Sequence, residues 1–213
     1  MHQHMTYNCS KPKTMTCILP FILFFGLSIN LKGQNDSLIK SQYDYIGRDE
    51  IYILNTGSDL KSNSKINVSE LRSSKAAEQL FGTNYTAKKF PEFLSQLAFT
   101  QIKYNDGLVL DIPEYPKSLI IFHITSDKYT LFLKNGPAIK IGMKADELRA
   151  IFPKSFSKRT VITDREDWKG KATFKVYFSQ IIKSKLVIEP SCIVFVLSGN
   201  NGVLEQLLSW MPD

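Results

Sequence analysis

Three carboxylates that lie close together in the sequence, Asp164, Glu166 and Asp167, are the first candidates for chemistry. Paired carboxylates act as general acid and base when their surroundings separate their pKa values, and clustered carboxylate oxygens bind calcium. The surrounding sequence, TDREDWKGK, is polar and typical of a solvated loop. We therefore expect these side chains to be exposed, and the sequence indicates no catalytic residue.

Cys192 and His123 are the only cysteine and histidine after residue 33. A tetrahedral zinc site would need two more ligands from elsewhere, and a nucleophilic thiolate needs a cationic or polar setting. Cys192 instead begins the apolar run CIVFVL, and His123 alternates with Leu119 and Ile121. We expect a buried cysteine, a partly buried histidine with a hydrogen-bond partner, and no metal site. With no Gly-x-Ser-x-Gly, Walker or dinucleotide-binding pattern, no cofactor is expected either.

Basic and aromatic side chains gather late in the chain, where residues 134–185 hold 13 basic and 5 acidic residues. If Ala172–Phe178 is a strand, its alternate side chains separate an apolar face from a face with aromatic and cationic groups. Such groups combine apolar area with specificity in recognition surfaces. The predicted binding residues are Trp168, Thr173, Lys175, Tyr177, Lys158 and Arg159. The alternative is an ordinary solvated sheet face.

The N-terminal sequence predicts export. Lys11 and Lys13 precede an uncharged apolar run, Cys17–Ile29, which is shorter than the roughly 20 residues that a membrane-spanning helix needs. We expect a signal peptide with cleavage near Gly33 or Gln34, and the alternative is an uncleaved membrane anchor. The mature chain would keep 180 residues and one cysteine, so its stability must come from packing rather than from a disulfide bond.

Turn residues and hydrophobic spacing divide the rest of the chain. A polar leader with a strand at Glu50–Leu54 precedes a helix over Glu70–Phe81 capped by Ser69, and a second helix begins at Pro91. Hairpins are predicted for Phe99–Ile112 and Ser118–Leu133.

A strand, a Gly142-Met143 corner and a helix over Ala145–Phe152, stopped by Pro153, begin the second half. The strands predicted after this helix are Arg159–Thr163, Ala172–Phe178, Leu186–Ile188, Cys192–Leu197 and Val203–Trp210. We expect Trp168 to be exposed and Trp210 to be packed.

The two halves can be superposed in sequence. A shift of 73 residues places Ser118 on Ser191 and Phe122 on Phe195, and a shift of 71 places Leu80-Phe81 on Ile151-Phe152. The superposition predicts an α+β fold of two tandem helix-plus-antiparallel-sheet units. The expected division is a signal peptide (1–33), a flexible leader with a short strand (34–66), a first α+β unit (67–136) and a second α+β unit (137–213).

The run from Ile141 to Leu148 resembles the Gly-Met corner of BamE-like envelope lipoproteins, and tandem units of this kind occur in β-lactamase inhibitory protein. The chain departs from that pattern with Lys144 at the helix cap and Pro153 at the following turn. The resemblance implies an envelope or secreted protein, without enzymatic activity, that binds another protein through a sheet face.

The sequence therefore predicts a secreted or periplasmic binding protein whose ligand is a protein or an anionic envelope component, not nucleic acid. Two alternatives remain: an envelope-acting hydrolase that uses the loop carboxylates Asp164, Glu166 or Asp167, and a structural envelope component without a discrete ligand.

Overall fold

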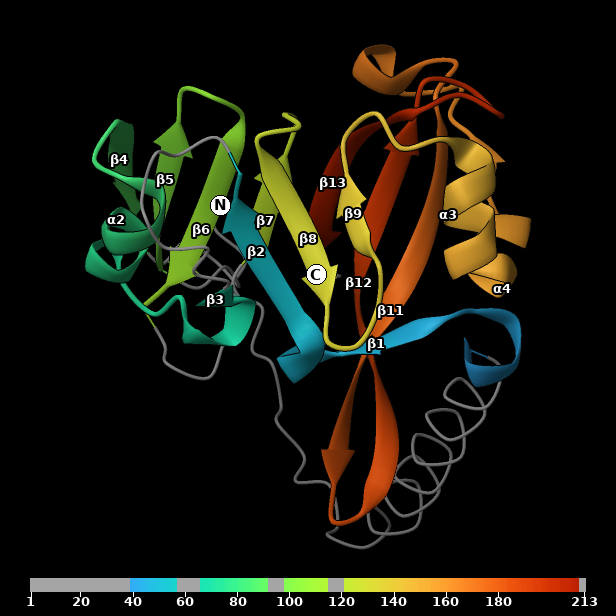
Figure 1. Ribbon diagram of the computed structural model, residues 1–213, viewed down its shortest axis with the longest axis horizontal. Helices are drawn as coiled ribbons and strands as arrows, with labels where there is room; N and C mark the ends of the chain where they lie inside the picture. The colour runs from blue at the N-terminus through green and yellow to red at the C-terminus, as the bar shows by residue number, and fades with distance from the viewer. Residues whose placement is uncertain (1–38, 57–65, 92–97, 115–120, 211–213) are drawn as a thin grey trace, which may run out of the picture. The chain divides into compact units, whose positions relative to one another are not determined.

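A nine-stranded sheet is the largest element of the computed structural model, which describes residues 39–56, 66–91, 98–114 and 121–210 (Figure 1). Its strand order is β1-β11-β12-β13-β7-β6-β5-β4, with β10 paired to β11, and every pairing except the parallel β1·β11 pair is antiparallel. The strands are β1 Tyr45–Gly47, β4 Tyr85–Phe90, β5 Phe99–Tyr104, β6 Leu108–Pro113, β7 Ile121–Ile124, β10 Thr160–Val161, β11 Ala172–Ile182, β12 Lys185–Leu197 and β13 Leu204–Trp210.

A second sheet of four strands has the order β3-β2-β8-β9. Its strands are β2 Ile51–Asn55, β3 Ile66–Asn67, β8 Tyr129–Leu133 and β9 Ala138–Lys140. Three side chains from this small sheet, Ile53, Leu131 and Ile139, are fully buried in the same hydrophobic core as the large sheet. The small sheet therefore packs on one face of the large sheet, which we call the core face.

The helices of the described chain are short. They are α2 Ser74–Phe81, α3 Ala145–Ile151 and α4 Pro153–Ser157, with 3-10 turns η1 Arg48–Glu50, η2 Val68–Glu70 and η3 Glu166–Trp168. Rings from α4 and from the end of α3 lie on the core face: the Phe152 ring is 5.2 Å from that of Phe195, and the Phe156 ring is 5.4 Å from that of Phe174. The α+β class is confirmed, with sheet far outweighing helix.

Strand order places β13 beside β7 in the middle of the large sheet. On one side of this pair the strands β7, β6, β5 and β4 run in reverse sequence order, and on the other side β13, β12, β11 and β10 do the same. In the small sheet the central pair is β2·β8. The hairpin predicted for Ser118–Leu133 is wrong, because β7 belongs to the large sheet and β8 to the small one; residues 118–120 lie outside the described residues.

The superposition at a shift of 73 residues is wrong for the strands. It pairs β7 with β12, yet β7 contacts β13 and β6, whereas β12 lies between β11 and β13. Hydrophobic strands of similar length resemble one another in sequence, because burial on one face imposes the same alternation on all of them.

The part of the predicted leader that the structure describes begins at residue 39 and packs on the fold. Asp44 and Ser155 exchange two hydrogen bonds, from Asp44 N to Ser155 Oγ (2.8 Å) and from Ser155 N to Asp44 Oδ2 (2.9 Å). Ile46 is buried, and β1 adds to the edge of β11. β1 is therefore an edge of the large sheet, because the buried Ile46 and backbone pairing offset the cost of ordering it. Residues 34–38 and 57–65 of the predicted leader lie outside the described residues.

The first predicted helix starts too early. Asn67 accepts a hydrogen bond from Ser69 N and makes a separate turn, η2, while the Ser73 hydroxyl caps α2 by accepting from Ala76 N (3.2 Å). Its predicted end is confirmed, since Gly82 adopts a φ of 86°. The helix predicted from Pro91 stays a prediction, because β4 ends at Phe90 and residues 92–97 lie outside the described residues.

The helix boundary at Pro153 and the strand boundaries after residue 178 also differ from the prediction. Pro153 does end α3, but it also begins α4, because proline suits the first position of a helix. Leu186–Ile188 and Cys192–Leu197 are parts of one long strand, β12, and its partner β11 continues to Ile182.

Candidate binding face

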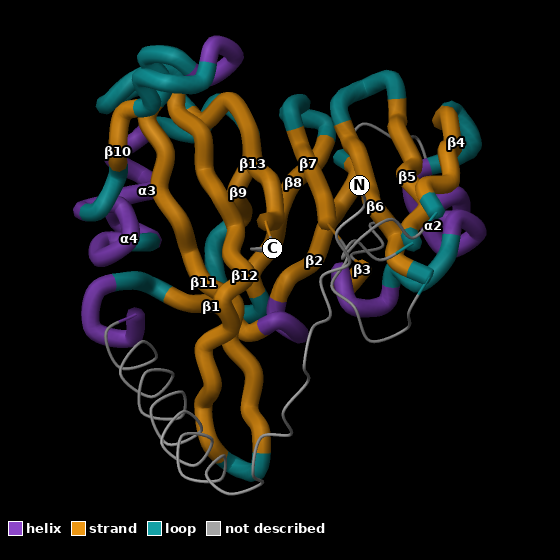
Figure 2. Tube along the Cα trace, turned by 180° about the vertical axis from the view of Figure 1, so that it is seen from behind, coloured by secondary structure: helices purple, strands orange, loops and turns teal. Residues whose placement is uncertain are grey.

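We call the side of the large sheet opposite the core face the outer face. Figure 2, in which the molecule is turned by 180° from Figure 1, looks onto this side. On β11, Phe174 and Val176 are buried on the core face, and the predicted alternation places Thr173, Lys175 and Tyr177 on the outer face. Strand register extends this face across two more strands. Its members on β11, β12 and β13 are Thr173, Lys175, Tyr177, Cys192, Val194, Val196, Gln206, Leu208 and Trp210.

A small apolar cluster forms the floor of the outer face. Cys192, Val194 and Val196 on β12 are buried there, although they lie on the side away from the main core. Trp168, Tyr177 and Leu208 pack against this floor and are partly exposed. The outer face therefore presents a continuous apolar surface with aromatic groups at its edges, which is the composition of a recognition surface.

A cation lies on this surface beside an exposed aromatic ring. Lys175 Nζ is 4.7 Å from the centre of the Trp210 ring, and Trp210 is 40 % exposed. Cross-strand register puts Lys175 opposite Val194 and Trp210 opposite Cys192. An exposed indole and a lysine held together in this way resemble the residues that dominate binding energy in interfaces.

Trp168 approaches the same cluster from the η3 turn. The Arg165 guanidinium lies 4.2 Å from the centre of the Trp168 ring, and Arg165 also forms an ion pair with Asp167 (3.3 Å). The sequence prediction that Trp168 is exposed and Trp210 packed is wrong. Trp168 packs on the floor because η3 folds over the end of the outer face. Trp210 is the last described residue of β13, and much of its side chain is exposed.

Two of the predicted binding residues do not belong to the outer face. Arg159 donates to the Asn200 side chain (Nε to Oδ1, 2.8 Å), and its guanidinium lies 4.5 Å from the Phe156 ring. Lys158 is exposed at the end of α4. Both residues lie between α4 and β10, and Arg159 is turned toward Phe156 and Asn200. The structure instead adds Trp210 and Leu208, which strand alternation on β13 would have identified if the face had been followed across the sheet.

The outer face continues toward β5 with mixed polarity. Register forms a row from Val194 through Leu208, His123 and Val109 to Lys103. His123 Nε2 lies 3.1 Å from Gln206 Oε1, so the prediction of a satisfied, partly buried histidine is confirmed. The far half of the face is therefore more polar than the half built from β11 to β13.

Asp111 lies beside this row. Burial raises the pKa of its carboxyl, and the hydrogen bond from Gln101 Nε2 (2.9 Å) opposes that rise. Asp111 is thus a partly desolvated carboxyl that has Gln101 as its hydrogen-bond partner.

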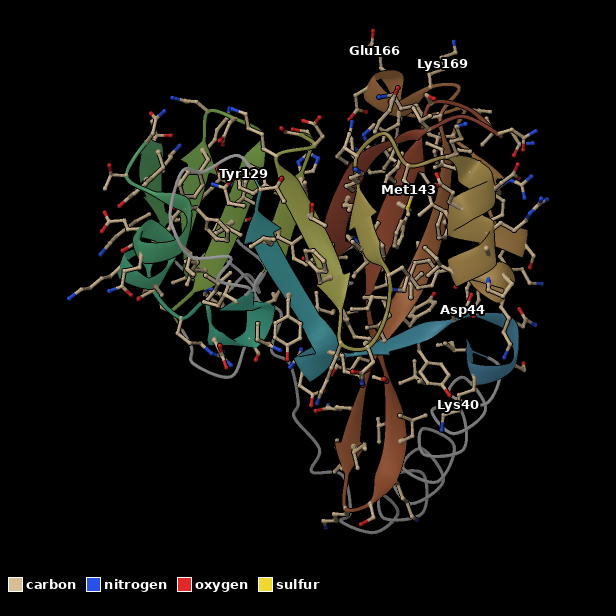
Figure 3. All side chains as sticks on the ribbon, viewed as in Figure 1. Lys40, Asp44, Tyr129, Met143, Glu166 and Lys169 are labelled. Carbon is tan, nitrogen blue, oxygen red and sulfur yellow. The ribbon has the colours of Figure 1, made fainter. Side chains whose placement is uncertain are left out.

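The loop carboxylates do not form a site. Asp164, Glu166 and Asp167 are exposed, as predicted, and Glu166 extends away from the sheet in Figure 3. Asp167 is engaged by Arg165, and among the described residues no three histidine, cysteine or acidic side chains are placed to hold a metal ion.

Cys192 is buried, as predicted. Burial raises the pKa of its thiol to about 11, and the nearby Lys175 ammonium opposes that rise only in part. A thiol with this pKa is almost wholly protonated at neutral pH and is a poor nucleophile.

A cavity of about 530 Å³ lies away from these residues. It is bounded by the segment from Tyr43 to Ile46, by the turn from Leu133 to Pro137 and by Ile151, Phe152 and Lys154. Asp44 in its wall is already bonded to Ser155, as described above, and none of the six predicted binding residues lines the cavity.

No protein-family model, curated protein or solved structure matches this chain. The resemblance to BamE-like proteins and to β-lactamase inhibitory protein thus stays an expectation from the sequence. Within the described ranges, the structure contains no helix that is both long enough and apolar enough to cross a membrane.

Proposed function

We propose that this protein is an exported, non-enzymatic binding protein that holds an acidic protein partner on the outer face of its large sheet. The observation that carries the proposal is the cluster on the outer face, where Trp168, Tyr177 and Leu208 pack against a buried apolar floor. Beside it, Lys175 lies over the exposed Trp210 ring. Desolvated aromatic groups beside a cation supply both affinity and specificity in protein interfaces.

Charge supports an acidic partner. Lys175 is exposed, and Lys103 is exposed at the other end of the row described above. Lys169 is exposed in the loop that carries Trp168, and Figure 3 shows its side chain extending into solvent. Complementary charge steers such a partner toward the face and makes the association sensitive to salt.

We also propose that the fold consists of two tandem units. Each would begin with a hairpin of the small sheet, continue through a short helix and end in a run of antiparallel strands of the large sheet. The first would run from β2 to β7 and the second from β8 to β13, which revises the boundary predicted at residue 136. Support comes from the two central pairs, β2·β8 and β7·β13, which join equivalent strands and are both antiparallel.

Export is supported by the sequence alone. The apolar run Cys17–Ile29 after two lysines, and a single cysteine beyond residue 33, agree with a secreted or periplasmic chain whose fold does not depend on disulfide bonds.

The test is affinity capture from the envelope and secreted fractions of the source cells. The bait is the protein, either unchanged, as Lys175→Glu with Trp210→Ala, or as the matched control Lys158→Glu, which makes the same charge change away from the outer face. We expect a partner with an acidic surface to be retained by the unchanged protein and by the control, to be lost by the double variant, and to elute with salt. An identical set of retained proteins for all three baits would overturn the proposal.

A further inference from the structure

The hairpin that joins β11 and β12 extends beyond the rest of the large sheet (Figures 1 and 2). The last pairing of β11 with β1 is at Ser179, and the last pairing of β12 with β13 is at Cys192. Among the described strands, residues 180–187 therefore pair only with one another. We call this segment the ribbon. A two-stranded ribbon alone is only marginally stable in water, so its length needs another explanation.

The end of the ribbon is rigid and apolar. Lys183 and Ser184 form a two-residue turn with φ values of 49° and 60°, the geometry that best fits the twist of a hairpin. Directly before this turn, Ile181 is 77 % exposed and Ile182 is 44 % exposed. Because neighbouring strand residues face opposite sides, the ribbon presents an isoleucine on each face.

Every charge at the end of the ribbon is positive. Lys183 and Lys185 are exposed, and the sequence from Gln180 to Ile188 contains no acidic residue. The next acidic residue, Glu189, is turned inward and forms an ion pair with Arg48 (2.9 Å). Two exposed isoleucines are thus flanked by two lysines in a stretch of sequence, Gln180 to Ile188, that has no acidic residue.

The base of the ribbon is braced against the fold. Glu189 Oε2 accepts from Ser191 Oγ (3.0 Å) as well as pairing with Arg48, and nearer the turn Lys40 Nζ donates to the carbonyl oxygen of Leu186 (2.9 Å). These contacts join the ribbon to the rest of the described fold and leave Ile181 and Ile182 exposed.

We propose that the ribbon inserts its end into the surface of a bilayer that contains anionic phospholipid. From Ile181 to the first turn residue, Lys183, the strand extends about 7 Å, which is within the depth at which amphipathic segments bury apolar side chains at the boundary between headgroups and acyl chains. Lys183 lies in the turn, beyond the isoleucines, so its ammonium would reach back to the phosphates along its flexible stem, and the ammonium of Lys185 would do the same. A lipid surface is favoured over a protein socket because the end is narrow, has an exposed isoleucine on each face and contains no acidic residue from Gln180 to Ile188, so its lysines offer phosphates a complementary charge.

A local probe tests this proposal in the full chain. Cys9 and Cys17 are replaced by serine, Cys192 is buried and stays unlabelled, and a polarity-sensitive fluorophore is attached at Ser184→Cys. The matched control carries the fluorophore at Asn201→Cys, an exposed residue in the turn at the opposite end of β12. Any membrane attachment through the apolar N-terminal run is common to both chains, so a difference between the labels reports the ribbon.

With vesicles of phosphatidylcholine and phosphatidylglycerol, we expect a blue shift and protection from an aqueous quencher at position 184 and not at position 201. Vesicles of phosphatidylcholine alone should give a weaker response, since each lysine contributes roughly fivefold in binding to an anionic surface. Equal quenching at both positions in the presence and absence of vesicles would overturn the proposal. The ribbon would then be a candidate for binding a protein instead of a lipid surface.

Substitution gives a second measure. Ile181→Ser with Ile182→Ser removes the apolar groups that would enter the bilayer. We expect the lipid concentration that gives half of the fluorescence shift at position 184 to rise at least about tenfold. Lys175→Glu with Trp210→Ala, on the outer face, should leave the shift unchanged, so failure of this proposal and failure of the proposed function are distinguishable. Equal shifts for the isoleucine variant and the unchanged ribbon would also contradict insertion.

Discussion

The ammonium group of Lys175 and the indole ring of Trp210 lie 4.7 Å apart, although β12 separates their strands. Lys175 faces the same side as Val194, and Trp210 faces the same side as Cys192, so the two side chains cross the floor of the outer face diagonally. The sequence predicted Lys175 as a binding residue, whereas it predicted Trp210 to be packed. Its consequences for binding and stability can be measured separately.

Trp210→Ala is expected to weaken partner binding while changing folding stability little. The ring is 40 % exposed, so truncation leaves no closed cavity, and we expect the free energy of unfolding to fall by about 1 kcal/mol or less. Loss of a central aromatic group in an interface costs about 2 kcal/mol or more of binding energy. Urea denaturation and titration with the captured partner give the two values. A fall in stability as large as the loss in binding would contradict a surface role.

Phe174→Ala should show the opposite behaviour. The Phe174 and Phe195 rings stack with centres 4.5 Å apart on the core face, and the Phe156 ring contacts Phe174 at its edge. Truncation opens a cavity there, so we expect the free energy of unfolding to fall by about 3–5 kcal/mol. Lys175→Ala, the neighbouring residue on the other face, is the control and should change it by less than about 1 kcal/mol. Similar losses for the two variants in urea denaturation would mean that the assignment of the faces is wrong.

Arg48→Ala is expected to destabilise the base of the ribbon. Only 9 % of the Glu189 side chain is exposed, and its Oε2 atom forms an ion pair with Arg48 and accepts a hydrogen bond from Ser191. Removing Arg48 leaves a buried carboxylate without its cation, which costs about 3 kcal/mol in such settings. Arg48→Met with Glu189→Leu removes both charges and should recover most of that loss. Thermal and urea unfolding test the pair, and a double variant no more stable than Arg48→Ala would contradict this account.

Stability should fall in alkaline solution. Burial raises the pKa of the Cys192 thiol from 9.0 to about 11, and burial also raises the pKa values of the Tyr104 and Tyr129 hydroxyls above the usual 10.0. The folded protein therefore holds these protons more tightly than the unfolded chain does, so deprotonation favours unfolding. The free energy of unfolding should be insensitive to these groups below pH 9 and should decline from pH 9 to 11 through Cys192, with the tyrosines contributing above pH 10.

Urea denaturation at fixed pH values measures this decline. Cys192→Ala is the control. It should remove the loss of stability that begins near pH 9 and leave the loss that is due to the tyrosines. A free energy of unfolding that rises between pH 9 and 11 would contradict the burial of these groups.

Local sequence predicted the elements whose geometry is set by a few neighbouring residues. The Asp106-Gly107 turn between β5 and β6 is confirmed, and Gly107 adopts a φ of 100° that other residues rarely accept. The alternation on β11 is also confirmed, because burial on one face imposes a period of two. Boundaries failed where two local signals competed, as at Ser69 and Ser73, of which only Ser73 caps α2.

The binding face was only half predictable. Thr173, Lys175 and Tyr177 follow from one strand read alone, and these residues do share a face. Trp210 and Leu208 join them only because β13 pairs with β12 in one register. Arg159 was grouped with them by sequence distance, but α4 turns it toward Asn200.

The sequence by itself determined the α+β class, the buried Cys192 and the split of β11 into an apolar face and a cationic, aromatic one. These properties depend on side-chain polarity and on turns of a few residues. Only the tertiary structure decided that β7 and β8 enter different sheets, that β13 pairs with β7, and that the β11–β12 hairpin projects beyond its neighbours. Antiparallel strands of similar composition pair equally well with many partners through their backbones, so the choice among them is made by the shared core that buries Phe122, Leu131 and Phe195 together.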